Sequence, residues 1–285
     1  MKVLFAGGGT AGHINPALAI AGYVLEREPK AEILYVGSSG GMEERLVPAA
    51  GFVFKGIEIS GFQRKLTPQN LKKNINTVRK IITASAESRR IINQFKPDIC
   101  VGTGGYVSGP VLRTAAKMGI PTILHAQNAY PGITTKMPSK KAKRVMLAIP
   151  DAEQFLKKKS NIVVTGNPVR KDVLRAKRAT SRTKLHLDAR PLILSFGGSL
   201  GARRINEAVA DLLEKSAKDH RFQHIHGYGQ HSKWFPKMLE DRGVHLEDCP
   251  NLDVREYISD MPTCLAAADL VICRAGAITL SELQA

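Results

Sequence analysis

Three glycine clusters are the residues of this chain whose types and spacing suggest chemistry. Each follows a short apolar run, and they read Gly7-Gly8-Gly9-Thr10-Ala11-Gly12, Gly102-Thr103-Gly104-Gly105 and Gly197-Gly198-Ser199-Leu200-Gly201. Glycine lets the backbone turn sharply and approach a ligand, and a helix that follows directs free N–H groups toward an anion. We therefore predict that the three clusters together bind phosphate. For some of the individual glycines, a tight turn that needs a positive φ is a sufficient explanation.

The first cluster also matches the dinucleotide fingerprint G-x-G-x-x-G, a pattern that is weak by itself. Its usual companion is an acidic residue at the end of the second strand, where it binds ribose. This chain has Tyr35-Val36-Gly37-Ser38 there, and no cluster carries the lysine of a Walker A loop. The sequence therefore disfavours NAD and ATP as ligands.

His13 follows the first cluster, at the expected start of a helix. The positive end of the helix dipole disfavours the imidazolium form, and a neutral imidazole can act as a general base. The other interpretation is a histidine that only caps or hydrogen-bonds its loop. Position alone favours neither interpretation.

Apolar runs and helical patterns alternate along the chain, which predicts parallel sheets with right-handed crossovers. Strands are expected over 3–6, 33–36, 99–101, 122–125, 145–149, 162–165, 192–196, 222–225, 252–254 and 270–273, and helices over 15–27, 42–50, 69–95, 109–118, 151–158, 202–218, 232–241 and 257–268. We predict an α/β protein of two Rossmann-like, doubly wound domains, residues 1–160 and 161–285, joined through the charged stretch 170–190. The second domain is expected to be incomplete, because it shows four strands and its last helix has barely begun.

The chain has 285 residues with 42 Lys and Arg against 25 Asp and Glu, a net charge of +17. Residues 1–160 hold 24 basic and 10 acidic side chains, so the first half is expected to meet an anionic partner. Aromatic residues make up only 6% and no nucleic-acid motif occurs, so nucleic acid is not an expected partner.

Basic and apolar residues combine over 61–90, where Leu71, Ile75, Val78 and Ile82 form a helical stripe beside eight basic side chains. Further basic residues follow at Lys140, Lys141, Lys143 and Arg144. One interpretation is an ordinary helix with solvated lysines. The interpretation we favour adds peripheral docking to an anionic membrane surface.

The four cysteines are Cys100, Cys249, Cys264 and Cys273; they lack a C-x-x-C pair, and three lie in or beside apolar runs. Buried, reduced thiols are expected. The first apolar stretch is too short for a signal peptide, and no window has the roughly 18 apolar residues of a membrane helix. From these observations we expect a cytoplasmic protein. Because an Asp-x-Asp motif is also missing, we expect no metal, and no other cofactor is expected.

Six motifs follow one another at compatible spacings: 8–17 (GGTAGHINPA), 102–110 (GTGGYVSGP), 125–128 (HAQN), 166–170 (GNPVR), 197–203 (GGSLGAR) and 274–282 (RAGAITLSE). Together they resemble the MurG family of N-acetylglucosaminyltransferases, from Met1 to Ala285. The resemblance implies a GT-B fold, in which two Rossmann-like domains face each other across a cleft. It also implies an inverting enzyme of cell-wall synthesis that converts lipid I to lipid II. Such an enzyme moves GlcNAc from UDP-GlcNAc to undecaprenyl-pyrophosphoryl-MurNAc-pentapeptide, at the cytoplasmic face of the membrane.

The resemblance also implies roles for single residues. His13 becomes the candidate base for the acceptor hydroxyl, and helix dipoles with backbone N–H groups stabilise departing UDP. Donor contacts are expected from Thr10, Ala11, Gly12 and Asn128 in the first domain and from Arg170 in the motif between the domains. In the second domain they are expected from Ser199, Ile258, Ala277, Ile278, Thr279, Leu280, Ser281 and Glu282. In the second set, Ser199 would hold a phosphate, Ile258 would meet the uracil through its backbone, and Glu282 would bind the ribose. The acceptor pyrophosphate is assigned to Gly8, Gly9, Gly104, Gly105 and Tyr106.

The chain departs from the family at two positions and toward its end. Ala126 replaces the glutamate of the family's His-Glu-Gln-Asn, which predicts reduced turnover, and Thr135 stands where asparagine is common. The family's glutamine-containing donor motif and the strands beyond it are not among these residues. Two alternatives stay open. One is a non-catalytic or impaired UDP-sugar-binding, membrane-associated protein, and the other is a GT-B enzyme with another donor or acceptor.

Overall fold

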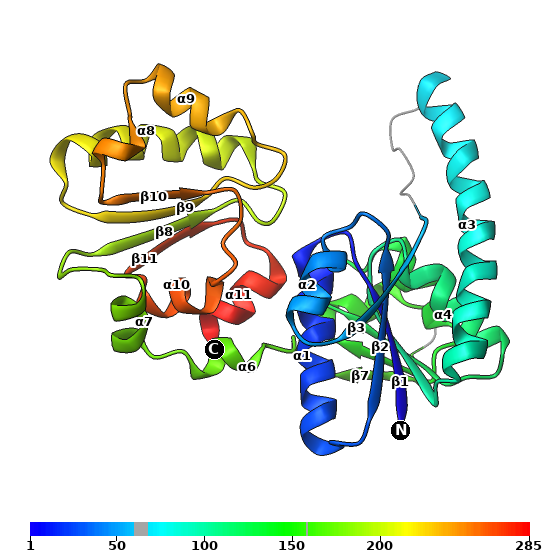
Figure 1. Cartoon of the computed structure of the whole chain (residues 1–285). Helices are drawn as coiled ribbons and strands as arrows, with labels where there is room; N and C mark the ends of the chain where they lie inside the picture. The colour runs from blue at the N-terminus through cyan, green and yellow to red at the C-terminus, as the bar shows by residue number, and fades with distance from the viewer. Residues whose placement is uncertain (60–67, 158) are drawn as a thin grey trace. The chain divides into compact units, whose positions relative to one another are not determined.

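The computed structural model describes residues 1–59, 68–157 and 159–285, and it divides into two compact units, 1–170 and 171–285 (Figure 1). Each unit is built on one parallel sheet with helices on both faces. This is the doubly wound α/β class that the alternation of apolar runs and helical patterns predicts.

The first unit contains a seven-stranded sheet in the order β3-β2-β1-β4-β5-β6-β7, with all neighbouring strands parallel. The chain order reverses between β1 and β4, where a doubly wound sheet opens a crevice at the carboxyl ends of its strands. The strands are β1 (Lys2–Gly7), β2 (Glu32–Ser38), β3 (Val53–Ile57), β4 (Ile99–Gly104), β5 (Thr122–Ala126), β6 (Arg144–Leu147) and β7 (Ile162–Val164).

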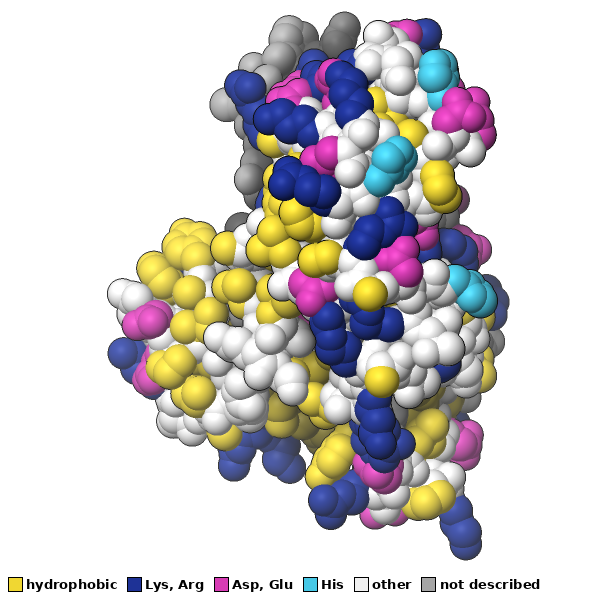
Figure 2. Space-filling model, turned by 90° about the vertical axis from the view of Figure 1, so that its left-hand side faces the viewer, with side chains coloured by type: hydrophobic (Ala, Val, Ile, Leu, Met, Phe, Trp, Pro, Cys, Tyr) yellow, Lys and Arg dark blue, Asp and Glu magenta, His cyan; other side chains and the backbone are white. Residues whose placement is uncertain are grey.

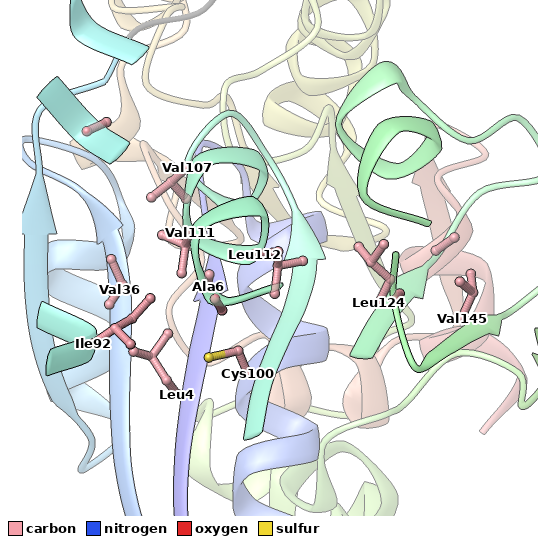
Figure 3. Close-up of a cluster of buried hydrophobic side chains, with 14 of the residues drawn as sticks. Leu4, Ala6, Val36, Ile92, Cys100, Val107, Val111, Leu112, Leu124 and Val145 are labelled. Atoms are coloured by element: carbon pink, nitrogen blue, oxygen red, sulfur yellow. The ribbon is translucent and has the colours of Figure 1, made fainter. Parts of the chain in front are cut away.

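Helices cover both faces of this first sheet. The helices α1 (Ala11–Arg27) and α2 (Glu43–Ala49) lie on one face, and α3 (Pro68–Phe95) and α4 (Ser108–Lys117) lie on the other (Figure 1). On the second of these faces, Leu4, Ala6 and Cys100 of the central strands join Ile92 of α3 and Leu112 of α4 in one buried cluster (Figure 3). The short helix α5 (Ile133–Ser139) and the 3-10 turn η1 (Pro150–Phe155) complete the unit.

Three elements of the first unit differ from the expectation. The helix α5 lies where the sequence predicts neither a helix nor a strand. The strand β3 was not expected from the sequence, because it is an edge strand that exposes Val53 and contains Lys55 and Gly56 within its short apolar run. The helix expected over 151–158 is the turn η1 instead. Of its residues only Ala152 is buried, so it lacks the apolar face that a longer helix needs.

The second unit repeats the arrangement with four parallel strands in the order β10-β9-β8-β11, and its order reverses between β8 and β11. Separate apolar clusters lie beneath α8 and α9 on one face and beneath α10 on the other (Figure 1). The elements are α6 (Lys171–Arg175), α7 (Arg178–Lys184), β8 (Leu192–Phe196), α8 (Arg203–Asp219), β9 (Gln223–Gly227), α9 (Phe235–Asp241), η2 (Leu246–Asp248), β10 (Leu252–Arg255), α10 (Met261–Ala267), β11 (Leu270–Cys273) and α11 (Ala277–Gln284).

The units divide after Arg170, later than the boundary expected after residue 160. The reason is β7, which pairs with β6 through Leu147 opposite Val164 and therefore belongs to the first sheet. The charged stretch 170–190, expected as a connection, forms α6 and α7 of the second unit.

The cysteines are free thiols, buried at Cys100, Cys249 and Cys264 and partly buried at Cys273. Desolvation raises the pKa of Cys100 to about 12, so this thiol stays protonated and unreactive. Within the described part of the chain, none of the helices combines the length and the apolar character needed to cross a bilayer.

Two histidines are buried side by side in the second sheet. His224 and His226 point to the same side of β9, and the Ser195 Oγ atom of β8 lies 2.7 Å from His224 Nε2 and 2.8 Å from His226 Nδ1. Desolvation lowers the pKa of His224 to about 3 and that of His226 to about 4. Both rings are therefore neutral in the folded protein at neutral pH.

We predict that the second unit loses stability as the pH falls below 6.5. An unfolded chain protonates histidine near pH 6.5, whereas the folded unit keeps both rings neutral until about pH 4. Since the unfolded state binds more protons in this window, the free energy of unfolding falls with pH by about 1.4 kcal/mol per pH unit for each histidine. Urea unfolding, followed by the fluorescence of Trp234, the chain's single tryptophan, measures this slope.

The variant His226→Gln should show a shallower slope than the wild type. His245→Gln, a matched change at an exposed position, should retain the wild-type slope. Equal slopes in all three proteins would contradict the prediction.

Candidate functional site

The first and second glycine clusters of the chain meet at the carboxyl ends of β1 and β4, where the strand order reverses. They touch through main chain at Gly8 and Gly105, and through the Thr103 side chain at Gly7. A Cβ atom on Gly105, whose φ is +81°, would lie 2.3 Å from the carbonyl oxygen of Gly8, and one on Gly7 would lie 2.3 Å from Thr103 Oγ1. Glycine alone permits this approach. The two clusters thus form one main-chain surface at the crevice.

A buried carboxylate holds the first glycine loop in place. Glu43, in the first turn of α2, is fully buried; its Oε2 accepts a hydrogen bond from Gly9 N–H at 3.1 Å and its Oε1 accepts one from Ser38 N–H at 2.7 Å. These charge-assisted bonds tie the loop after β1 to the end of β2. Sequence reasoning missed Glu43, because an acidic residue after Gly40-Gly41-Met42 indicates only a helix start.

His13 lies in the first turn of α1 with its ring beside Gly104. Its Nδ1 atom is 3.1 Å from the Thr103 carbonyl oxygen and 3.3 Å from Gln127 Oε1. Desolvation by burial lowers the pKa of His13 below 6.5, while the hydrogen bonds to Gln127 and Thr103 act in the opposite direction. The ring is therefore neutral at neutral pH, as a general base requires. Sequence reasoning gave Thr103 and Gln127 no role of their own. The one signal that could have found them is their membership in the motifs 102–110 and 125–128.

Most other residues predicted in the first unit lie at the same end of the sheet. Thr10 is the N-cap of α1, with Ala11 and Gly12 in the first turn, and all three are partly exposed. Asn128 is exposed next to Gln127, and Tyr106 is half exposed after Gly105. Arg170 is the last residue of the unit.

The family departures at Ala126 and Thr135 are both buried. Ala126 is 3% exposed and belongs to the apolar cluster between the sheet, α3 and α4. Because successive strand residues point to opposite faces, its side chain lies on the other side of the strand from His125 and Gln127. The reduced turnover that we predict from Ala126 remains a prediction.

The second unit builds its glycine loop in a similar way. The loop Gly197–Gly201 follows β8 and packs on the loop after β9, where a Cβ atom on Gly201 would lie 2.3 Å from the Tyr228 carbonyl oxygen. A Cβ atom on Gly198, whose φ is +91°, would lie 3.1 Å from Arg274 Nη2. The guanidinium of Arg274, which sequence reasoning left without a role, therefore lies over the loop that contains Ser199.

Helix α11 begins just beyond Arg274, with Gly276 as its N-cap. The predicted donor residues occupy its first turn and the residues that follow: Ala277, Ile278, Thr279, Leu280, Ser281 and Glu282. The first-turn N–H groups of a helix have no partner within the helix and favour an anion. Ile258 is 4% exposed as a whole residue, and its side chain packs on Gly227.

Each unit thus offers the first-turn N–H groups of a helix, α1 or α11, at the switch point of its sheet, whereas the Gly9 N–H group of the first loop is taken by Glu43. The first unit adds a neutral imidazole, and the second adds the guanidinium of Arg274. Main-chain N–H groups with a fixed cation suit a pyrophosphate, and a neutral imidazole beside an anion site suits proton transfer from a hydroxyl group.

Sequence profiles of two domains match the chain. The glycosyltransferase family 28 N-terminal domain matches residues 3–147, and the glycosyltransferase family 28 C-terminal domain matches residues 192–285.

Curated relatives match along the whole chain. The UDP-N-acetylglucosamine–N-acetylmuramyl-(pentapeptide) pyrophosphoryl-undecaprenol N-acetylglucosamine transferase of Acetivibrio thermocellus is 47% identical, over 100% of this chain and 75% of the relative. The protein of the same name from Desulforamulus reducens is 44% identical, over 99% of this chain and 76% of the relative.

Solved structures show the same architecture. MurG from Acinetobacter baumannii is 31% identical with a TM-score of 0.61, over 99% of this chain and 75% of that one. A UDP-GlcNAc 2-epimerase from Neisseria meningitidis, solved with UDP-GlcNAc bound, has a TM-score of 0.63 at 15% identity, over 98% of this chain and 78% of that one. The second likeness concerns the fold alone.

We predict that Glu43→Gln loosens the first glycine loop. A glutamine side chain turns an N–H group toward one of the two main-chain donors, which leaves that donor unsatisfied and costs about 1–3 kcal/mol. Amide hydrogen exchange should therefore become faster at whichever of Gly9 and Ser38 faces the new NH2 group. The control Glu44→Gln changes the exposed neighbour, which accepts a bond from Gly40 N–H, and should leave exchange at Gly9 unchanged. Equal protection of both Gly9 and Ser38 in the two variants would argue against this role of Glu43.

Proposed function

The chain belongs to glycosyltransferase family 28, among the MurG transferases, and we propose that it moves N-acetylglucosamine from UDP-N-acetylglucosamine to undecaprenyl-pyrophosphoryl-N-acetylmuramyl-pentapeptide. This reaction converts lipid I to lipid II in peptidoglycan synthesis. The observation that carries the proposal is 47% identity, along the whole chain, to a transferase of that name. The family and the GT-B class with two Rossmann-like domains, both expected from the motifs, are confirmed.

The donor is assigned to the second unit. The Gly197–Gly201 loop, the first turn of α11 and Arg274 offer main-chain N–H groups and a cation for the pyrophosphate of UDP. Ser199, Ile258 and the α11 residues up to Glu282 take the roles that the family resemblance implies for phosphate, uracil and ribose. Arg170, Thr10, Ala11, Gly12 and Asn128 complete the donor contacts.

The acceptor is assigned to the first unit. Its pyrophosphate would meet the main-chain surface formed by Gly8, Gly9, Gly104 and Gly105, with Tyr106 exposed beside them. The sugar hydroxyl attacks the anomeric carbon of N-acetylglucosamine while the bond from that carbon to UDP breaks. His13 takes the hydroxyl proton on Nε2, because Nδ1 faces the oxygens of Thr103 and Gln127.

We predict that His13→Ala lowers turnover by about 10²–10⁴-fold, the usual contribution of a general base. The donor residues of the second unit are unchanged, so the affinity for UDP-N-acetylglucosamine measured by calorimetry should change little. A transfer assay with a lipid I analogue measures turnover, and His245→Ala, at an exposed position, serves as the control. Lost donor affinity with turnover otherwise intact would mean that His13 is a donor contact instead of the base.

An anionic membrane surface is the further partner that we infer, with the protein bound peripherally at the cytoplasmic face. The basic group Lys140, Lys141, Lys143 and Arg144 is exposed, and none of these side chains pairs with a carboxylate among the described residues. In the second unit, ion pairs such as Arg178–Asp269 and Arg242–Asp211 neutralise many cations. On the face in Figure 2, acidic side chains lie among the basic ones. Leu71, Ile75 and Val78 of the expected stripe lie outside the described side chains.

We predict that Lys140→Ala with Lys141→Ala weakens binding to vesicles that contain anionic lipid by about 10- to 30-fold, at roughly 1 kcal/mol per lysine. The control pair Lys177→Ala with Lys184→Ala removes the same charge from exposed positions of the second unit and should bind as the wild type does. Co-sedimentation at rising salt should weaken wild-type binding. Equal binding to neutral and anionic vesicles would exclude electrostatic docking.

A further inference from the structure

Gln127 joins three structural segments through one buried amide. It follows β5, is 4% exposed, and its Nε2 atom lies 2.8 Å from the Thr103 carbonyl oxygen, 3.2 Å from the His125 carbonyl oxygen and 3.1 Å from His125 Nδ1. Its Oε1 atom lies 3.3 Å from His13 Nδ1. One amide therefore links the residue after β5 to the end of β4 and to the first turn of α1.

The orientation of this amide follows from the chemistry of its neighbours. Two of the atoms around Nε2 are main-chain carbonyl oxygens, which only accept hydrogen bonds. The NH2 group must face them, since an oxygen placed there would meet two acceptors. The amide oxygen consequently faces the ring of His13.

His125 agrees with this orientation. Its Nε2 atom lies 3.0 Å from the carbonyl oxygen of Gly166, so it carries the hydrogen and donates. Its Nδ1 atom is then a lone-pair acceptor, which suits the N–H group of Gln127 at 3.1 Å. The chain of hydrogen bonds from Gly166 through His125 and Gln127 to His13 has a single consistent direction.

The same logic fixes the tautomer of His13. Its Nδ1 atom faces two acceptors, the Thr103 carbonyl oxygen and Gln127 Oε1, so the hydrogen of the neutral ring resides on Nδ1. The Nε2 atom keeps its lone pair and makes no hydrogen bond within the described residues. Gly104 lies against the Nδ1 side, where a Cβ atom would come within 2.7 Å of that nitrogen.

We propose that Gln127 is a positioning residue that holds the hydrogen of His13 on Nδ1 and thereby presents the Nε2 lone pair as the proton acceptor. This inference rests on the proposed function of His13. A neutral amide suits the task, because it orients the ring without the added attraction for a proton that a carboxylate in the same place would exert.

The tautomer is measured directly by ¹⁵N chemical shifts of histidine-labelled protein, with the His13 signals assigned by their loss in His13→Gln. In the wild type at pH 7.5, Nδ1 should have the shift of a protonated nitrogen and Nε2 that of an unprotonated one. In Gln127→Leu a population with the hydrogen on Nε2 should appear. Identical His13 shifts in wild type and Gln127→Leu would overturn the proposal, whether or not the protein transfers sugar.

Kinetics provide the second readout. Gln127→Leu should lower kcat by about 10- to 100-fold and leave the KM for UDP-N-acetylglucosamine unchanged. The decrease should be smaller than in His13→Ala, because the Thr103 carbonyl oxygen still accepts a hydrogen bond from His13 Nδ1. Gln94→Leu, an exposed glutamine on α3, is the matched control and should keep wild-type kcat. Equal kcat in the two variants would overturn the proposal. Absent transfer by the wild type would instead count against the proposed function.

Gln127→Asn keeps the test decisive if the leucine variant does not fold. Asparagine keeps the amide but is one methylene shorter, so its NH2 group cannot hold the Thr103 and His125 carbonyl oxygens while its oxygen stays at His13 Nδ1. The hydrogen bond from Gln127 raises the pKa of His13, so its loss should move the acid limb of the pH profile of kcat down from the wild-type position, which lies below pH 6.5 because burial lowers the pKa of His13. An acid limb that stays in place in Gln127→Asn would show that residue 127 does not act on His13.

Discussion

The close approach of two loops without Cβ atoms is the constraint on which the first unit's site depends. Gly8 and Gly105 touch through main chain at the point where the order of the sheet reverses, and a Cβ atom on Gly105 would lie 2.3 Å from the Gly8 oxygen. Any side chain there would push the ends of β1 and β4 apart. The position of α1 follows from this contact, because its first turn leaves the same loop, and His13 moves with it.

Buried polar groups then hold what the glycines allow. Glu43 accepts main-chain N–H groups from both the first loop and the end of β2, and Gln127 connects His125, Thr103 and His13. Such groups must find partners once water is excluded, so each fixes the geometry around it. Glycine residues allow the loops many backbone conformations. The carboxylate of Glu43 and the amide of Gln127, which come from other segments of the chain, select one of them.

The second unit solves the same problem with a similar topology. Its sheet order is again reversed beside the first strand, and Gly201 approaches the loop after β9 as closely as Gly105 approaches Gly8. The polar partner differs: a guanidinium, that of Arg274, lies at the loop in place of an imidazole. A common scaffold thus offers main-chain donors for anions twice, and the added side chain gives each site its own chemistry.

The sequence by itself determined the doubly wound class, the glycine loops and His13, because periodic apolar runs, glycine clusters and a helix start are local properties that chain order records. It missed the edge strand β3, because exposed residues alternate with less exposed ones along that strand and interrupt the apolar pattern. It also placed the boundary between the units before β7, because only the pairing of β7 with β6 assigns β7 to the first sheet. Only the tertiary structure decided the partners of His13. Glu43, Thr103 and Gln127 lie far from one another in the chain, and only folding places Thr103 and Gln127 at the ring of His13 and Glu43 beneath its loop. Burial, which sets the protonation of His13, arises from that same packing and is invisible in the order of residues.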